Sequence, residues 1–338
     1  MKKTIKKYSK KAKTKKRKMY GGKRKKVVKT KRRLTKRNRD EYLNKKFKKL
    51  QCSPKLESET NPFSCYTNRS LHKMRNLWNA RHPDAKINSN DAKQIWKALQ
   101  SNMSSVCDTE RCWMRQNFMK NNLDKELTTH TFAPMTPPEW NTNPHEWLSS
   151  VDILNVMKQY EKTYPCFEFL GPSPIDYDTH KMYGECVWEE LCHFSLQDQI
   201  NKGKRKIGII FNLDPHYKPG SHWVSIFINI NKRLIFFFDS NGDKPPSKIK
   251  KFINTVLKQS KNITIKGEPQ RKESFTYDNN FPTSHQDENT ECGMYSLYAI
   301  IQQVKDKLNP MDLKDASKKI TDKQMRKFRK IYFNEYKK

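Results

Sequence analysis

The sequence predicts an α+β fold, in which a mixed sheet is flanked by helices and follows a helical segment and a disordered basic tail. Two observations support this fold class. After residue 146, short runs of apolar and β-branched residues alternate with segments whose apolar residues recur at helical spacing. Before that point the charge is uneven: of the formal net charge of +34 on 338 residues, residues 1–50 contribute +24, with 26 Lys and Arg against Asp40 and Glu41.

Residues 1–50 are predicted to be a disordered basic tail, because their like charges repel and they hold too few apolar residues to offset chain entropy. Three interpretations of the tail remain open: an inert solubilising arm, a nuclear address, or a contact with nucleic acid. We favour non-specific tethering to DNA or RNA, since such a charge binds polyphosphate electrostatically. The tail also contains Gly21-Gly22, which we interpret as a hypothetical self-cleavage site.

Membrane insertion and export are not expected. The longest apolar stretches, such as residues 234–238, are far shorter than the roughly 18 residues of a spanning helix. The basic start is followed by further basic residues and not by the apolar segment of a secretory signal. A reducing compartment is therefore expected.

Eight cysteines in a chain of this length do not indicate a disulfide scaffold, so free thiols are predicted. Two groups offer zinc-ligand chemistry, but neither supplies two tight Cys-x-x-Cys pairs. We therefore predict core thiols, no metal and no cofactor. The groups considered are Cys186, Cys192 and His193, and Cys107 with Cys112.

Residues 51–130 are expected to form a helical N-terminal segment. Helical spacing covers residues 70–79, a second helix begins at Asn90 as its N-cap and extends through Leu99, and a third covers residues 108–118. Residues 131–145 are interpreted as a proline-rich connector.

Residues 146–308 are predicted to be the mixed domain, and residues 309–338 a C-terminal helical extension in which Thr321 and Gln324 form a capping box. A helix that follows Pro246 is expected to have Ser247 as its cap. In chain order, the predicted elements of the domain are a helix at 147–160, strands at 206–213, 223–230 and 234–238, the helix capped by Ser247, a strand at 263–265, a polar loop at 277–291 and a helix at 292–304.

Two polar residues flank the predicted hairpin of 223–230 and 234–238: His222 precedes it and Asp239 follows it. With an even-length loop, Ile230 faces Arg233, and His222 and Asp239 become diagonal neighbours, with backbones roughly 7–8 Å apart. The carboxylate can then orient the imidazole and stabilise its cation. An odd-length loop would place the two residues on opposite faces, so the pairing depends on the register.

Cys292 opens an apolar helix after a polar loop. Free N–H groups and the dipole at a helix N-terminus favour the thiolate, and a nearby imidazolium favours it further. Gly293 allows another chain segment to approach closely, and Gln286 can offer an amide N–H to a developing oxyanion. His216 and His285 flank the same loops and are interpreted as solvated residues without a partner.

These residues occur in a recognisable order: His222-Trp223, Asp239 seventeen residues after the histidine, and Gln286 separated by five residues from Cys292-Gly293. The order resembles the ubiquitin-like (SUMO) protease clan, which includes adenovirus protease. Residues 147–153 and 290–293 are most similar to the large-DNA-virus branch, comprising poxvirus core protease, asfarvirus polyprotein protease and giant-virus thiol proteases. The resemblance covers about 145–305. Ser149 departs from the Asn of cellular members, which weakens the case for ubiquitin-like substrates.

The resemblance implies a papain-like, adenain-like cysteine protease core. Cys292 would be the nucleophile, His222 the general base and acid, and Asp239 the orienting carboxylate. Gln286 would complete the oxyanion hole. Trp147 would be a lid over the substrate backbone and Trp223 a wall of the channel.

The resemblance further implies an endopeptidase that cuts viral capsid or core precursors at Gly-Gly-X or Ala-Gly-X sites during virion maturation. Glycines lack Cβ and pass beneath a narrow lid. The expected location is the virion and the virus factory in the host cytoplasm, with the nucleus also compatible with the basic tail. Two alternatives remain: an isopeptidase that removes SUMO or ubiquitin, and a nucleic-acid-binding protein with an inactive protease-like fold.

Overall fold

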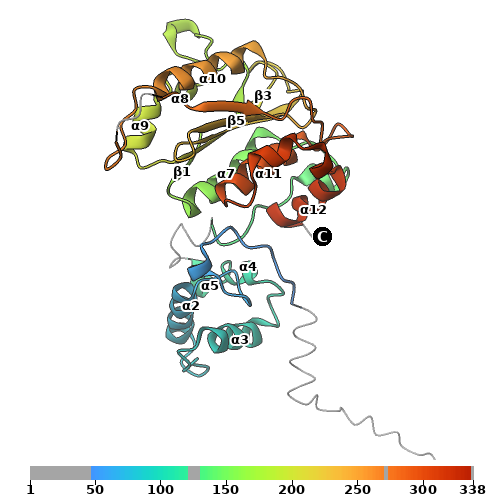
Figure 1. The fold of residues 1–338 in the computed structure, drawn as a ribbon. Coiled ribbons are helices and arrows are strands. Elements are labelled where there is room, and N and C mark those ends of the chain that lie inside the picture. Colours follow the sequence, from blue (N-terminus) through green and yellow to red (C-terminus); the bar gives the residue numbers. More distant parts are fainter. Residues whose placement is uncertain (1–46, 121–129, 270–272, 336–338) are drawn as a thin grey trace, which may run out of the picture. The chain divides into compact units, whose positions relative to one another are not determined.

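The computed structural model describes residues 47–120, 130–269 and 273–335 (Figure 1). Residues 1–46 of the predicted basic tail, with the Gly21-Gly22 site, lie outside these residues. The last four residues of that tail were wrongly predicted as disordered, because Phe47 and Leu50 pack against the core of the N-terminal helical segment. No helix in the described part of the chain is long and apolar enough to cross a membrane.

The centre of the molecule is a mixed β-sheet. Its strand order is β1-β3-β4-β5-β6, and β2 also pairs with β3. The pairs β3–β4 and β4–β5 are antiparallel, whereas β1 and β2 run parallel to β3, and β6 runs parallel to β5. The strands are β1 (Phe167–Phe169), β2 (Ser173–Pro174), β3 (Lys206–Asn212), β4 (Trp223–Asn229), β5 (Leu234–Phe238) and β6 (Thr276–Asn279).

Helices cover both faces of this sheet, which explains why its central strands are buried along almost their whole length. Phe236 and Phe238 of β5 pack toward one face with α7 and α11, whereas Ile235 and Phe237 pack toward the other with α10. Figure 1 shows α7, α11 and α12 on one side of the sheet and α8, α9 and α10 on the other. These helices are α7 (Ser150–Thr163), α8 (Glu189–Cys192), α9 (Leu196–Asn201), α10 (Ser247–Ser260), α11 (Cys292–Val304) and α12 (Asp322–Tyr332). The α+β class with a mixed sheet flanked by helices is confirmed.

The register of the β4–β5 hairpin follows the even-length alternative. Ser225 is opposite Phe238, and this register places Ile230 opposite Arg233 and Val224 opposite Asp239. The conditional prediction about the hairpin is therefore confirmed.

Several predicted elements differ from those in the structure. The helix expected from residue 147 begins at Ser150, because the hydroxyl of Ser149 accepts the backbone N–H of Asp152 and the Asp152 carboxylate accepts the N–H of Ser149. Ser247 is the first residue of α10 and not its cap, which is Pro246. No strand forms at 263–265. The strand that pairs with β5 is β6, part of which was predicted as loop, because the exposed edge of β5 selects its partner through tertiary contacts.

The N-terminal helical segment has a core of its own, in which the rings of Tyr66 and Trp113 stack with centroids 6.0 Å apart. The cap of its second long helix is Asp91 and not Asn90, because the Asp91 carboxylate accepts the N–H of Gln94. The elements are η1 (Glu57–Glu59), α2 (Asn68–Arg81), α3 (Ala92–Met103), α4 (Glu110–Trp113) and α5 (Asn117–Lys120). A 3-10 turn, η2 (Pro138–Asn141), follows in the proline-rich stretch.

Residues beyond 308 share the core of the mixed domain. Leu313, Met325 and Tyr332 pack in the same cluster as Leu297 and Ile301 of α11. Thr321 and Gln324 form the predicted capping box. Two 3-10 turns, η4 (Pro310–Lys314) and η5 (Ala316–Lys318), precede α12. The segment predicted as an extension thus completes the hydrophobic core around α11.

The prediction of free thiols was wrong for six of the eight cysteines. Turns bring their Cα atoms to 5.1, 5.5 and 6.2 Å, distances that a disulfide spans. Cys166 and Cys292 are free. The three disulfides are Cys52–Cys65, Cys107–Cys112 and Cys186–Cys192.

Candidate active site

His222 and Asp239 meet at one end of the β4–β5 hairpin. His222 directly precedes β4 and Asp239 directly follows β5, so the observed register brings the two side chains together. The imidazole Nε2 lies 2.7 Å from Asp239 Oδ1. The Nδ1 atom is thus the ring nitrogen that remains for a reacting partner.

Asp239 is held from both directions along its backbone. The Asn280 side chain accepts the N–H of Asp239 at 2.9 Å and donates to its carbonyl at 2.6 Å. The N–H of Asn241 donates to Asp239 Oδ1 at 2.8 Å. Asn280 is fully buried, and nothing in the sequence separates it from the other polar residues of its loop. It is a positioning residue that sequence reasoning missed.

Cys292 begins α11, as predicted, and is almost fully buried. Its side chain is one of the groups that raise the pKa of His222. Burial of the imidazole acts to lower its pKa, but the hydrogen bonds to Asp239 and Cys292 and the charges of both groups outweigh burial and raise the pKa of His222 to about 10. The ring is therefore a cation at neutral pH, beside the sulfur at the start of a helix.

The residue before Cys292 is anchored by α12. Glu291 is fully buried, and its Oε2 accepts a hydrogen bond from Arg329 Nε at 2.8 Å. The same guanidinium donates to the carbonyls of Pro144, Glu146 and Thr290. Arg329 thus joins the segment before α7 to the segment before α11, and so fixes where the sulfur lies. Sequence reasoning placed Arg329 in the C-terminal extension and assigned it no role.

Gln286 lies close to Asp239 through its neighbour Ser240. The hydroxyl of Ser240 donates to Gln286 Oε1 at 2.8 Å, and the Ser240 carbonyl accepts the N–H of Gln286 at 2.9 Å. Because the amide oxygen is occupied, the NH2 end of Gln286 is the end available to a ligand. Ser240 is a second positioning residue that sequence reasoning missed.

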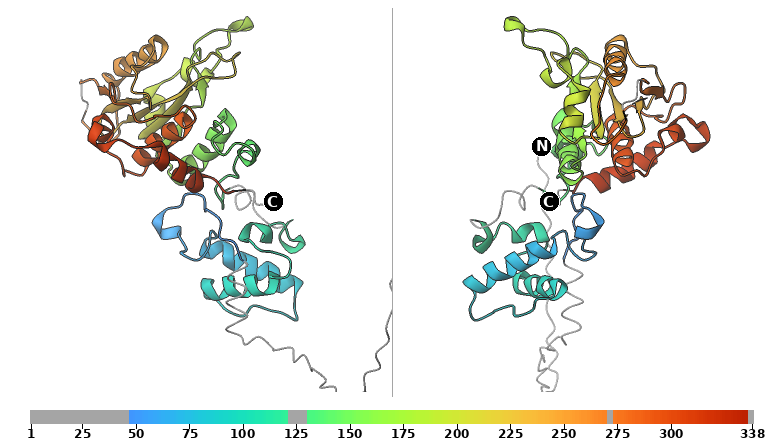
Figure 2. Two further views of the ribbon diagram at one scale, coloured as in Figure 1. Left: turned by 90° about the vertical axis from the view of Figure 1, so that its right-hand side faces the viewer. Right: turned by 60° about the vertical axis from the view of Figure 1, so that its left-hand side comes forward.

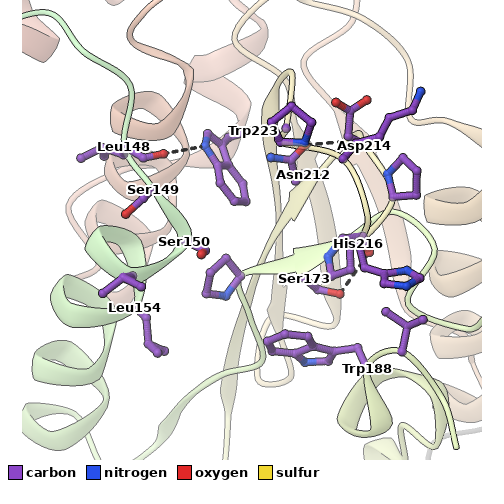
Figure 3. Close-up of a pocket in the computed structure, with 18 of the residues that line it drawn as sticks. Leu148, Ser149, Ser150, Leu154, Ser173, Trp188, Asn212, Asp214, His216 and Trp223 are labelled. Carbon is purple, nitrogen blue, oxygen red and sulfur yellow. Dashed lines mark hydrogen bonds between the residues drawn. The ribbon is translucent and has the colours of Figure 1, made fainter. Parts of the chain in front are cut away.

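Trp223 lies beside the start of α11. Its indole Nε1 donates to the Leu148 carbonyl at 3.0 Å (Figure 3). A Cβ atom on Gly293 would lie only 3.1 Å from Leu148 Cβ and 3.3 Å from Trp223 Cδ1. The absence of a side chain at Gly293 is therefore what allows Leu148 and Trp223 to approach the start of α11.

A groove with a volume of about 600 Å³ extends along this region. Leu148, Ser149 and Leu154 line one side, and Trp188 and His216 line another (Figure 3). Trp147 also lines the groove and is half-buried, but it precedes α7 instead of opening it. The two tryptophans that were predicted to contact substrate thus both border one groove.

The prediction that His216 and His285 have no partner was wrong. His216 Nδ1 lies 2.7 Å from Asp176 Oδ2. His285 is fully buried: its Nε2 is 2.9 Å from the Leu313 carbonyl and its Nδ1 accepts the N–H of Ile320. Burial lowers the pKa of His285, so it serves as a neutral bridge between the loop and η4.

Comparison with known proteins agrees with this geometry. Residues 194–338 match the Ulp1 protease family, C-terminal catalytic domain. This part of the chain, which is less than half of its length, resembles the catalytic domain of Ulp1-family cysteine proteases. The protease is 29% identical to a protein of Acanthamoeba polyphaga mimivirus named as a thiol protease, over 72% of this chain and 75% of that one. It is 27% identical to a cysteine protease of African swine fever virus, over 74% and 91%.

A solved structure shares the fold. The crystal structure of the African swine fever virus protease superposes with a TM-score of 0.59 at 20% sequence identity, covering 85% of this chain and 96% of that one. The resemblance to the viral branch of the clan is confirmed, and the protein is an enzyme of the cysteine protease type.

Proposed function

We propose that this protease is an endopeptidase that cleaves viral structural precursors at Gly-Gly-X or Ala-Gly-X sites, with Cys292 as nucleophile. The observation that supports the assignment is the position of one half-buried imidazole, whose Nε2 contacts a buried carboxylate and whose pKa is raised by both Asp239 and Cys292. A histidine held in this way can both stabilise a thiolate and transfer a proton.

In the acylation step, the Cys292 thiolate attacks the carbonyl carbon of the scissile bond, and the carbonyl electron pair moves onto oxygen. The backbone N–H of Cys292 and the NH2 group of Gln286 stabilise this oxyanion. The imidazolium of His222 then gives its proton to the leaving amine as the C–N bond breaks, which leaves a thioester on Cys292.

In the deacylation step, neutral His222 removes a proton from water as the water attacks the thioester. The C–S bond breaks, the carboxylic acid product leaves, and the thiolate–imidazolium pair is restored. Asp239 favours the imidazolium in both steps because its carboxylate accepts the Nε2–H.

The preference for glycine follows from the lining of the groove. Leu148 and Trp223 already touch the start of α11, and Trp147 borders the same groove. A substrate backbone that reaches Cys292 passes these bulky side chains, and residues without Cβ pass most easily. The named relatives are proteases of large DNA viruses, which supports viral proteins as the substrates. Structural precursors as the substrates, and the virion and host cytoplasm as the location, are part of the proposal.

The test compares two kinds of substrate on the purified chain: peptides that contain Gly-Gly-Ala, and SUMO or ubiquitin conjugates. The peptides should be cleaved at the glycine pair with a higher kcat/KM than the conjugates. Cys292→Ala should abolish cleavage, because the variant lacks the sulfur that attacks the scissile carbonyl. Cys166→Ala is the matched control, since Cys166 is the other free cysteine and is exposed.

Each opposite result would point to a different function. Faster cleavage of the conjugates would favour the isopeptidase alternative. Cleavage that survives Cys292→Ala would remove Cys292 from the mechanism. A chain that cleaves neither substrate, and in which a thiol-directed probe labels Cys292 equally with and without His222→Ala, would indicate an inactive scaffold.

A further inference from the structure

A second group of cysteine and histidine side chains lies in a hairpin at residues 179–188. The hairpin is closed by backbone hydrogen bonds from Val187 to Thr179 and from Lys181 to Glu185. Its tip, η3 (Met182–Gly184), turns through positive φ angles at Tyr183 and Gly184. Figure 2 shows this yellow-green segment projecting from the sheet. The short helix α8 follows directly and packs back on the base of the hairpin.

Four possible metal ligands converge there from 14 residues of chain. His180 and Cys186 face each other across the hairpin, and Cys192 and His193 lie at the end of α8. The Nε2 atoms of His180 and His193 are 3.8 and 3.9 Å from the sulfur of Cys186. In the described part of the chain, two groups have all their ligand atoms within 4.8 Å of one another: His180, Cys186 and Cys192 form one, and Cys186, Glu189 and His193 form the other. Cys186 belongs to both groups and joins them.

These distances are close to the geometry of a tetrahedral zinc site. Zinc binds thiolate sulfur at about 2.3 Å and imidazole nitrogen at about 2.0–2.1 Å, which gives an S···N edge of about 3.6 Å. The two S···N distances exceed that edge by only a few tenths of an ångström. His180 and His193 are exposed, so their rings can adjust and an ion can enter.

The other two cysteine pairs provide an internal comparison. Among the described residues, Cys52–Cys65 and Cys107–Cys112 belong to no group of three or more metal-ligating side chains. A disulfide needs no imidazole beside it, so two histidine nitrogens directed at one sulfur require another explanation. The geometry points to a Zn²⁺ site formed by His180, Cys186, Cys192 and His193.

Two carboxylate contacts support the arrangement of the ligands. The Glu189 carboxylate accepts the N–H of Cys186 at 2.6 Å through Oε1, and its Oε2 lies 3.3 Å from His193 Nε2. Glu189 thus ties the start of α8 to the hairpin. Its carboxylate lies beside the same His193 nitrogen that faces Cys186, so it belongs to the group of possible ligands and is not an outer support of the ring.

Zinc and the disulfide are alternative states of the same two sulfurs. In this structure Cys186 and Cys192 are joined. A thiol reductant such as glutathione converts the bond to two thiols while two of its own sulfurs form a disulfide. Zn²⁺ then forms two Zn–S bonds and releases the two thiol protons, while each neutral imidazole supplies a lone pair.

The site bears on the protease because its hairpin borders the substrate groove. Lys181, Val187 and Trp188 all line that groove. The metal would therefore hold one wall of the groove in place. Metal binding itself does not depend on the proposed cleavage specificity, since none of the four ligands belongs to the catalytic group.

The experiment uses the full chain with Cys292→Ala, reduced by a phosphine without oxygen, and titrates it with Co²⁺ as a spectroscopic substitute for Zn²⁺. One equivalent should produce the visible absorption of a tetrahedral site together with a sulfur-to-cobalt charge-transfer band. Zn²⁺ added afterwards should displace the bound Co²⁺ and remove both bands. The disulfide-bonded chain should give neither band.

Variants assign the ligands. Cys186→Ser with Cys192→Ser should abolish the charge-transfer band, and His180→Ala with His193→Ala, which alters exposed side chains and leaves the fold intact, should weaken binding at least about 10-fold. The control Cys107→Ser with Cys112→Ser should bind as the parent does. Absence of both bands in the reduced parent, equal binding by the serine variant, or equal affinity in the histidine variant would overturn the site.

Discussion

Two places in this protein set a cysteine beside a histidine, and they differ in what lies behind the ring. His222 has the buried carboxylate of Asp239 at 2.7 Å and one buried sulfur, Cys292. The hairpin and α8 together hold two sulfurs, Cys186 and Cys192, and the exposed imidazoles of His180 and His193 lie near the sulfur of Cys186. The first arrangement favours a charged ring that exchanges protons, and the second offers several lone pairs to one cation. The surroundings, more than the residue types, decide which chemistry a Cys–His pair performs.

The largest expected effect on activity comes from removing the carboxylate of Asp239, which contacts His222. Asp239→Asn should lower kcat by about 10⁴-fold, because the ring loses the acceptor that orients it and stabilises its cation. The raised pKa of His222, about 10, keeps the ring protonated up to that pH in the wild type. The alkaline limb of the pH–rate profile should therefore move to lower pH in the variant.

The raised pKa of His222 also makes the stability of the protein depend on pH. Because the folded pKa of His222 lies above its unfolded value, its contribution is full below about pH 6.5 and is lost as the pH rises through about 10. Asp176→Asn is the matched control, since Asp176 holds His216 at the same 2.7 Å distance. If that control moves the alkaline limb as far as Asp239→Asn does, the limb does not report His222.

A second prediction concerns the ion pair that anchors the segment before Cys292, and its effect on the free energy of unfolding. Arg329→Met should lower the free energy of unfolding by about 3–5 kcal/mol, because the fully buried Glu291 loses its partner. Combining it with Glu291→Gln should recover part of the loss, since the remaining group is neutral. Urea unfolding curves measure both. Unchanged stability of Arg329→Met would show that the ion pair does not anchor the segment before Cys292.

The smallest effect on activity is expected from changes to the hairpin at residues 179–188 and the helix that follows it. In reducing buffer with Zn²⁺, Cys186→Ser with Cys192→Ser should raise KM about 3- to 10-fold, equivalent to about 1 kcal/mol, because one wall of the groove loosens. The value of kcat should stay the same, since no group at Cys292 changes. A fall in kcat with constant KM would instead mean that the hairpin acts on the chemical step.

The core of the site could be predicted because its signals are local. The His222–Asp239 pairing needed two apolar strands and a short loop, and the register then followed from the side-chain period of two. The start of α11 at Cys292 followed from an apolar periodic run after a polar loop. Gln286 was predicted from its position six residues before Cys292, whereas its contact with Ser240 was not foreseen.

The parts that were missed depend on contacts between segments far apart in the sequence. Asn280 lies 41 residues from Asp239, and Arg329 lies 38 residues from Glu291. β6 was assigned to a loop because its residues carry no strand pattern, and only the edge of β5 makes them a strand. The cluster at Cys186 was dismissed because the search used paired Cys-x-x-Cys spacing and did not include His180.

The burial of Cys292 has a practical consequence for inhibitors. With 1% of its surface exposed, this sulfur is shielded from bulky alkylating reagents, whereas Cys166 is open to solvent. A general electrophile should therefore modify Cys166 first and leave turnover largely intact. An effective covalent drug would carry its warhead on a thin, extended arm, shaped to thread between the indole and the leucine that flank the entrance.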